Sequence, residues 1–464
     1  MRKNLLRAIP KVDELIANEQ VQGLLEFAPR NLVLEVIREA LSELRQLLVS
    51  VEETALPESL DMTALIKTIS DEVEKRNGYH LKRVINATGV VIHTNLGRSL
   101  LAPSIAQHLS EVSCYYSTLE YDLETGKRGT RYSHVESLLC ELTGAEAALV
   151  VNNNAAAVML VLSTICAGKE VVVSRGQLVE IGGAFRVPDV MRASGAELVE
   201  VGTTNKTHLR DYAAAIRGQT AAVLKVHTSN YRILGFTSEV EIEALSGLCR
   251  EKNIPLIEDL GSGSLIDLSQ YGLMKEPTVI ESMRAGADVV TFSGDKMLGG
   301  PQAGIILGRK TWIDAMKKNQ LTRALRVDKM TLCALEATLK LYRDPEAVRR
   351  EIPTVRMLTE RQDAILPRAI ELQVQIEALG SAYESSLYET ASEVGGGSLP
   401  LEKLPTWAVS VKHSEQSTQR LTEALRARRL PIVARVAEDR LIFDLRTVQD
   451  GEADVIVQAL RELM

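Results

Sequence analysis

The chain has 464 residues, of which 45% are hydrophobic and 25% charged, so it can bury a large core and is not of the disordered class. Its net charge of -7 excludes a generally basic surface of the kind that nucleic-acid binders carry, so any contact with nucleic acid should be local. No stretch approaches the ~20 apolar residues of a membrane span, and Pro10 interrupts the start before a signal-peptide apolar region develops. We therefore expect a cytoplasmic protein, and the five widely spaced cysteines are typical of reduced thiols.

Residues 1–78 have the pattern of a helical domain. Apolar residues recur at spacings of three and four, which predicts one buried helical stripe. Its members are Val33, Val36, Ile37, Leu41, Leu44, Leu47 and Leu48. The segment is acidic as a whole, yet its first charged residues are all basic and could meet phosphates, although an ordinary charged terminus is the more common explanation. These first basic residues are Arg2, Lys3, Arg7 and Lys11.

The composition changes near residue 79, where Gly and Asn become more frequent. The sequence from there predicts a large α/β domain over 79–350. Seven short apolar runs alternate there with helical segments, which favours a mostly parallel seven-stranded sheet with crossover helices. The runs are 147–151, 171–174, 197–201, 221–227, 255–258, 289–292 and 304–307. Ligands of such sheets bind at the carboxyl ends of the strands.

The last part of the chain predicts a smaller α+β domain over 351–464. A helical region extends to about residue 380, and three apolar runs then alternate with two helices. We expect strands at 407–411, 432–436 and 441–445 and helices near 417–428 and 452–463. The run Gly395-Gly396-Gly397 indicates a loop that is flexible or closely approached by another group.

A lysine-bearing stretch, residues 291–304, has the features of a Schiff-base site. Lys296 follows an apolar run, and Gly299-Gly300-Pro301 behind it leaves room for a flat cofactor. Ser293, three residues before the lysine, could take a phosphate oxygen. For this stretch alone, a solvated lysine in a glycine-rich turn is the more common explanation.

Two further strand ends carry matching chemistry. After the run 147–151, Asn153, Asn154 and Ala155 turn into a helix, whose first backbone amides can bind a cofactor phosphate. Asparagine also caps helices without any ligand. Asp259 ends another run and could pair with a pyridinium nitrogen, or it could be a turn residue.

Three features follow one another along the chain: the helix start at residues 153–155, which we call the phosphate cup, the acidic strand end at Asp259, and Lys296. Together and in this order they predict a pyridoxal 5'-phosphate enzyme. No metal-ligand spacing is present, so no metal is expected. Arginines add a possible second oxyanion site, because guanidinium groups suit tetrahedral anions, although surface salt bridges would explain any single one. They are Arg98, Arg131, Arg323 and Arg326, the last two spaced by one helical turn.

Several longer motifs resemble bacterial selenocysteine synthase, the L-seryl-tRNA(Sec) selenium transferase family, over nearly the whole chain. They comprise residues 85–89, 93–98, 121–134, 152–157, 258–263, 291–304 and 395–400. The resemblance implies a fold-type I pyridoxal-phosphate enzyme with a helical N-terminal domain that holds tRNA. It also implies a homodecamer, a pentamer of dimers, with active sites at dimer interfaces.

The resemblance further implies a role for each site residue. Lys296 would be the Schiff-base lysine, Arg98, Arg323 and Arg326 would bind the selenium donor, and Arg131 and Asp295 would line the catalytic pocket. Seryl-tRNA(Sec) would lose its serine hydroxyl by β-elimination to an aminoacrylyl-tRNA. Lys296 would be the general base and Asp259 would hold the pyridinium charge. Selenium from selenophosphate would then add to give selenocysteinyl-tRNA(Sec).

Two alternatives remain open from the sequence. A pyridoxal-phosphate lyase for a small phosphorylated amino sugar or amino acid could share the core and the arginines, but it gives residues 1–78 no evident task. A catalytically silent RNA-binding or assembly protein on the same scaffold is the other, and the intact Lys296, Asp259 and phosphate cup count against it.

Overall fold

The computed structural model describes residues 1–181 and 185–464, which fold as two compact units, Met1–Arg83 and Val84–Met464. The three-domain division predicted from the sequence stays a prediction, although the first unit ends close to the predicted boundary. No helix in the described part of the chain is both long and apolar enough to cross a membrane.

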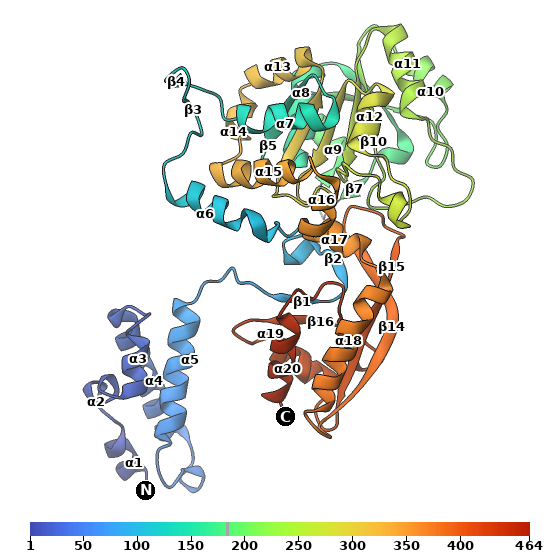
Figure 1. Ribbon diagram of the computed structural model, residues 1–464. Helices are drawn as coiled ribbons and strands as arrows, with labels where there is room; N and C mark the ends of the chain where they lie inside the picture. The colour runs from blue at the N-terminus through green and yellow to red at the C-terminus, as the bar shows by residue number, and fades with distance from the viewer. Residues whose placement is uncertain (182–184) are drawn as a thin grey trace. The chain divides into compact units, whose positions relative to one another are not determined.

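The first unit is built of helices, as the sequence predicted (Figure 1). Its helices are α1 (Arg2–Ala8), α2 (Val12–Ile16), α3 (Glu19–Leu24), α4 (Arg30–Ser50) and α5 (Met62–Asn77). The stripe of α4 packs against α5, and Val33 and Ile37 are completely buried there with Ile69. Leu47 was wrongly placed in that stripe, because it lies on the outer side of the last helical turn and is 58% exposed.

A seven-stranded sheet forms the larger layer of the second unit and confirms the predicted runs. Its strands, in spatial order, are β5 (Ala147–Val151), β13 (Gly304–Gly308), β12 (Val289–Ser293), β11 (Leu256–Gly261), β10 (Thr220–Val226), β6 (Glu170–Ser174) and β9 (Glu197–Val201). All neighbouring pairs are parallel except those of β13, which runs antiparallel to both β12 and β5.

Both faces of this sheet are covered by helices, which explains why most of its strands are apolar without alternation. In β5, Ala147, Leu149 and Val151 face one core, whereas Ala148 and Val150 face the other. The first core is covered by α8 (Asn154–Ile165), α9 (Val187–Ala193) and α13 (Lys310–Lys318). The second is covered by α7 (Ser133–Thr143), α10 (Leu209–Ala215), α11 (Ile242–Lys252), α12 (Val279–Ala285) and α15 (Lys329–Leu341).

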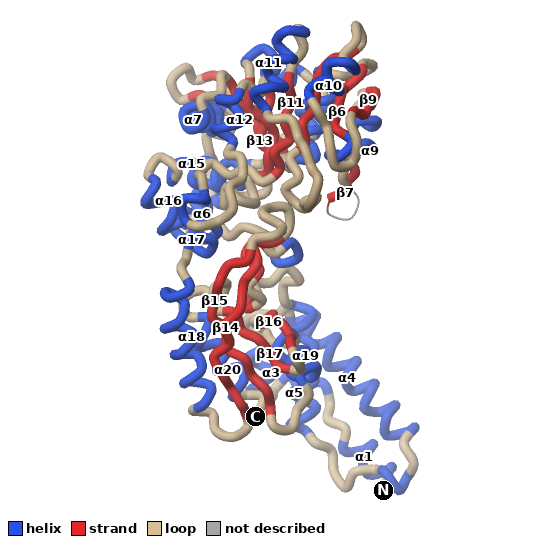
Figure 2. The backbone as a smooth tube through the Cα atoms, turned by 90° about the vertical axis from the view of Figure 1, so that its right-hand side faces the viewer, coloured by secondary structure: helices blue, strands red, loops and turns tan. Residues whose placement is uncertain are grey.

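A six-stranded sheet forms the other layer and appears as a separate red stack in Figure 2. Its order is β1 (Ile85–Ala87), β16 (Ile432–Ala437), β17 (Arg440–Asp444), β15 (Lys403–His413), β14 (Tyr383–Gly395) and β2 (Val90–Ile92). The helices α18 (Gln362–Glu377), α19 (Thr418–Arg426) and α20 (Glu452–Arg461) share its core. The sequence reading missed β14, and it assigned residues 85–92 to the large domain although they pair with C-terminal strands here.

Shorter elements connect these layers. They are α6 (Ala106–Cys114), α14 (Leu321–Ala324), α16 (Pro345–Glu351), α17 (Pro353–Thr359) and the small pairs β3 (Tyr121–Asp122) with β4 (Lys127–Arg128) and β7 (Glu180–Ile181) with β8 (Phe185–Arg186).

The turn between β1 and β2 depends on a glycine. Gly89 has a φ of +79°, and its backbone N–H donates to Thr447 Oγ1 at 3.1 Å. A β-carbon at this position would overlap the buried carboxylate of Asp444, which accepts from Ser392 Oγ and Thr406 Oγ1. The position therefore excludes side chains for two reasons, backbone conformation and lack of space.

We predict that Gly89→Ala lowers the free energy of unfolding by about 2–4 kcal/mol, since strain at positive φ adds to displacement of a buried carboxylate. The control is Gly144→Ala, because Gly144 also has positive φ (+76°) but no atom near the added methyl group, so only about 1 kcal/mol should be lost. Thermal or denaturant unfolding measures both, and equal losses would contradict the steric argument.

Candidate active site

Lys296 lies in the turn that follows β12, at the carboxyl edge of the large sheet. Its side chain is only 8% exposed, although a lysine is rarely buried without a specific reason. Burial lowers the pKa of the Lys296 amine below its usual value; the nearby Asp259 and Asp295 carboxylates oppose this shift, and the Arg98 guanidinium adds to it. A lysine with a lowered pKa is more often uncharged, which is the form that acts as a nucleophile or base.

Asp259 is fixed by its neighbours on both sides. It lies on β11 and points to the same sheet face as Ile257, beneath the start of α8. Its Oδ1 accepts hydrogen bonds from Asn154 Nδ2 at 2.8 Å and from Thr291 Oγ1 at 3.1 Å. Burial raises the pKa of Asp259, and these two hydrogen bonds act in the opposite direction. The result is an oriented carboxyl group that retains one uncommitted oxygen.

The predicted phosphate cup is the N-terminus of α8. Asn153 Oδ1 accepts from Ala156 N at 2.9 Å, so the capping interpretation holds for Asn153 itself. The backbone is so close here that a β-carbon on Gly304 would overlap the carbonyl of Asn153. Ser293 is the last residue of β12 and is buried. It precedes Lys296 by three residues in the sequence. Ala155 follows Asn154 in the first turn of the same helix.

The residues present fit pyridoxal 5'-phosphate. Asn154 Oδ1 is a buried polar atom without a hydrogen-bond partner among the described residues, as expected where a polar ligand binds. Asp259 supplies a carboxylate, and the α8 N-terminus supplies backbone N–H groups. No group of three or more metal-ligating side chains occurs within residues 1–181 and 185–464.

Arg98 and Asp295 lie close to Lys296. Arg98 Nη1 donates to Asp295 Oδ2 at 2.8 Å, and Ser99 Oγ donates to the Lys296 carbonyl at 2.6 Å. Arg98 has a φ of +62°, an uncommon conformation for arginine that persists only where the surroundings enforce it. Lys296 and Arg98 line a cavity of about 430 Å³ together with Gly395–Gly397.

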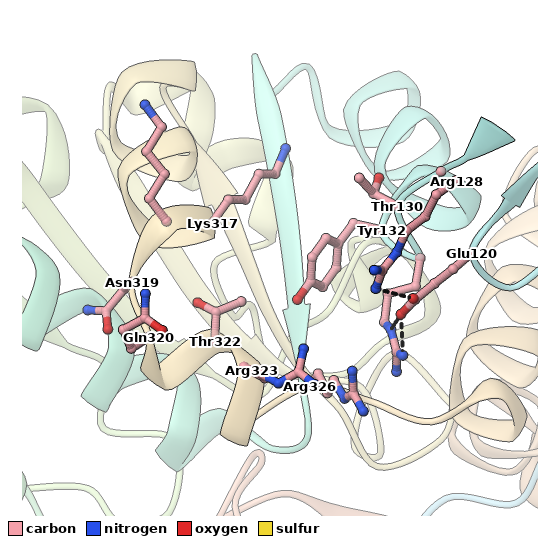
Figure 3. A pocket seen from close by; sticks show the side chains of 13 residues that line it. Glu120, Arg128, Thr130, Tyr132, Lys317, Asn319, Gln320, Thr322, Arg323 and Arg326 are labelled. Atoms are coloured by element: carbon pink, nitrogen blue, oxygen red, sulfur yellow. Dashed lines mark hydrogen bonds and ion pairs between the residues drawn. The ribbon is translucent and has the colours of Figure 1, made fainter.

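The other three arginines line a different cavity of about 320 Å³, drawn in Figure 3. Six basic residues and the single carboxylate of Glu120 line it. Arg131 is held by Glu120 and by the Val327 carbonyl. The guanidinium groups of Arg323 and Arg326 make no hydrogen bond or ion pair with other described residues, so they are available to an anion.

One part of the arginine prediction is wrong. Arg323 and Arg326 do not share a helix, because α14 ends at Ala324. Asn152 N donates to the Leu325 carbonyl at 2.9 Å, and Arg326 forms a β-bridge with Val151. This pairing draws the chain into an extended conformation beside the phosphate cup, yet both side chains still reach one cavity.

Sequence reasoning missed Glu276 and the exact role of the glycine run. A β-carbon on Gly397, whose φ is +85°, would lie 2.6 Å from Lys296 Nζ. The sequence predicted that the glycine run is either flexible or closely approached by another group, and the lysine amine is the group that approaches it. Glu276 lies near the same lysine, and only 7% of it is exposed. It could not be found from the sequence, because an isolated glutamate in a loop belongs to no recognisable motif.

A mostly parallel sheet with a buried lysine beyond one strand and a carboxylate on the next defines a fold-type I pyridoxal-phosphate-dependent enzyme, as predicted. The chain belongs to the L-seryl-tRNA selenium transferase family, whose model matches residues 84–449. A second model, described as selenocysteine synthase N terminal, matches residues 6–45.

Relatives and a solved structure agree with this assignment. The chain is 53% identical to the L-seryl-tRNA(Sec) selenium transferase of Alkaliphilus metalliredigens, with 98% of each chain covered. It is 50% identical to the protein of that name from Clostridium botulinum strain Okra, with 100% of this chain and 99% of that one covered. A solved D-glucosaminate-6-phosphate ammonia-lyase has a TM-score of 0.57 at 24% identity, covering 84% of this chain and 97% of its own; that likeness concerns the fold alone.

We predict that the Lys296 amine of cofactor-free protein titrates below the usual value for lysine. Arg98→Met removes a neighbouring positive charge and should raise the midpoint, whereas Asp295→Asn removes a negative charge and should lower it. The pH dependence of cofactor uptake, followed by absorbance, measures the midpoint. Arg361→Met, at an exposed ion pair with Asp363, is the control and should cause no shift. Shifts of Arg98→Met and Asp295→Asn in one direction would contradict the charge argument.

Proposed function

We propose that this protein converts seryl-tRNA(Sec) to selenocysteinyl-tRNA(Sec), with selenophosphate as the selenium donor. The observation that carries the proposal is the identity of about half of all residues, over the full chain, with proteins named L-seryl-tRNA(Sec) selenium transferase. The lyase alternative from the sequence has support only from a likeness of fold. The silent-scaffold alternative has none, and the intact Lys296, Asp259 and phosphate cup count against it.

The chain's own residues divide the chemistry between them. Lys296 would carry the cofactor, with Asp259 at its ring nitrogen, Asn154 beside Asp259, and Asn153, Ala155 and Ser293 at its phosphate. Pyridoxal phosphate, when bound, supplies an electron-accepting ring that stabilises negative charge at the substrate Cα.

The freed amine of Lys296 would take the proton from Cα of the seryl group, and the serine hydroxyl would leave as water. Burial of Nζ supports this role, since it favours the uncharged amine. Selenium of selenophosphate would then form a bond to Cβ, and hydrolysis of the selenium–phosphorus bond releases phosphate. One water is released and one consumed, so the reaction balances as serine plus selenophosphate to selenocysteine plus phosphate.

The arginines would hold the donor's phosphoryl group. Arg323 and Arg326 have uncommitted guanidinium groups in a cavity with a large excess of basic residues, which favours a dianion. Arg131 lines the same cavity, whereas Arg98 lies with Asp295 beside Lys296. We propose that a second copy of the chain brings the two cavities together at a dimer interface. The family resemblance supports a decamer made of five such dimers, and a cytoplasmic location is proposed on the same ground.

The first unit would bind the tRNA. Its own core, including Val33, Ile37 and Ile69, is independent of the second unit, and residues 6–45 match a model of the selenocysteine synthase N terminus. Lys3, Arg7 and Lys11 are exposed at its start, whereas the Arg2 guanidinium is held by the Val51 carbonyl.

We expect the wild-type protein to transfer selenium from labelled selenophosphate into acid-precipitable tRNA when given seryl-tRNA(Sec). Lys296→Ala should lose this activity and also the visible absorbance of the lysine-bound cofactor. Lys310→Ala is the matched control, because that lysine is exposed and forms only a surface ion pair with Asp314, so both readouts should persist. Lysine-bound cofactor absorbance in Lys296→Ala would show that another lysine holds the cofactor.

A protein that begins at residue 84 should keep cofactor absorbance but lose affinity for tRNA by about 100-fold or more, since phosphate contacts dominate such binding. Filter binding at fixed salt measures the affinity, with an unrelated tRNA as the control. Undiminished binding by the truncated protein would remove the reason for assigning tRNA to the first unit and would favour the lyase alternative.

A further inference from the structure

The loop of residues 395–400 lies directly over Lys296. Gly397 has no side chain, and the position of a β-carbon there would be 2.6 Å from Lys296 Nζ. A substrate amine that approaches Nζ from this side has to displace the loop backbone. The neighbouring cavity of about 430 Å³ is lined by the same glycines, so displacement of the loop would enlarge an existing opening.

One buried carboxylate touches this loop between Gly397 and Pro400. Glu276 Oε1 accepts a hydrogen bond from Leu399 N at 3.2 Å. Leu399 has a φ of +47°, so its backbone is in a conformation that needs external support. A hydrogen bond to a charged acceptor in a buried place gives such support.

A second donor faces the same carboxylate oxygen. His227 directly follows β10, and its backbone N–H donates to the Asp259 carbonyl at 2.9 Å, which fixes the residue beside the site. Its ring Nε2 is buried, has no hydrogen-bond partner among the described residues, and lies 3.7 Å from Glu276 Oε1. This distance is about half an ångström beyond a hydrogen bond, so a small rotation of the carboxylate would form one.

We propose that Glu276 is a positioning residue that alternates between two partners, the Leu399 amide when the loop covers Lys296 and the His227 ring when the loop lifts. Lifting the loop breaks the bond to Leu399 and would leave a buried carboxylate without a donor, which is strongly unfavourable. His227 removes that penalty by donating from Nε2. The inference rests on the proposed function in one respect, that Lys296 must admit a substrate amine.

The test is hydrogen exchange of cofactor-free, full-length protein, read by mass spectrometry on peptides that contain Leu399. Glu276→Ala should accelerate exchange of this amide about 10-fold or more, because a hydrogen bond to a charged group is lost. His227→Phe should slow it about threefold or more, because the open state loses the donor that the His227 ring supplies to Glu276. These opposite signs separate the proposal from a simple structural role, for which both changes would loosen the loop.

Two further variants complete the design. Glu276→Gln keeps an acceptor of the same shape without the charge, so it should accelerate exchange less than alanine does, and it decides the question if the alanine variant does not fold. Asp61→Ala is the matched control, because Asp61 also accepts a backbone N–H, from Ala64 at 2.9 Å, but belongs to the first unit, so it should leave Leu399 unchanged.

Two results would overturn the proposal. One is a Leu399 exchange rate within twofold of wild type in Glu276→Gln and in any folded Glu276→Ala protein. The other is faster Leu399 exchange in His227→Phe. Equal acceleration by Asp61→Ala would also do so. No turnover enters the measurement, so a failure of the proposed selenium transfer would be seen separately.

Discussion

The burial of a lysine and an aspartate at one edge of the large sheet is the constraint on which the site depends. Removing two charges from water is expensive, and the cost is tolerable only when hydrogen bonds and neighbouring charges compensate it. Asp259 meets this condition through Asn154 and Thr291, which come from the start of α8 and from the adjacent strand β12. The same contacts therefore orient the carboxyl group and lock the α8 N-terminus against the sheet.

The topology explains why these residues can meet although they are far apart in sequence. Parallel strands end at one edge, and register pairs Asp259 directly with Thr291, five residues before Lys296. Strand alternation then separates neighbours: Asp259 faces α8, whereas Glu258 points to the opposite core and is fully buried there. A shift of register by one residue would exchange these two carboxylates and destroy the site.

Most of the fold could be predicted from the sequence, because six of the seven strands are almost entirely buried and leave largely apolar runs. Strand β14 was missed for the opposite reason: its burial is irregular along Tyr383–Gly395, and polar residues such as Glu384 and Glu389 obscure any period. The order of the cup, the aspartate and the lysine was enough to predict the cofactor. Arg326 was misplaced because pairing with Val151 overrides the local helical tendency, and no local pattern reports a contact so distant in sequence.

The Arg98 guanidinium group has enough donors to bind a second group while it keeps its hydrogen bond to Asp295. A guanidinium group has five N–H donors in a planar fork, and Asp295 uses only Nη1. The remaining donors can face the cavity that Lys296 also lines, so an oxyanion bound there would add to the contact with Asp295 and need not replace it. Asp295 in turn keeps the guanidinium in place and offsets the effect of its positive charge on the lysine. An anion that engages the other edge of this rigid fork would therefore leave the hydrogen bond between Arg98 and Asp295 intact.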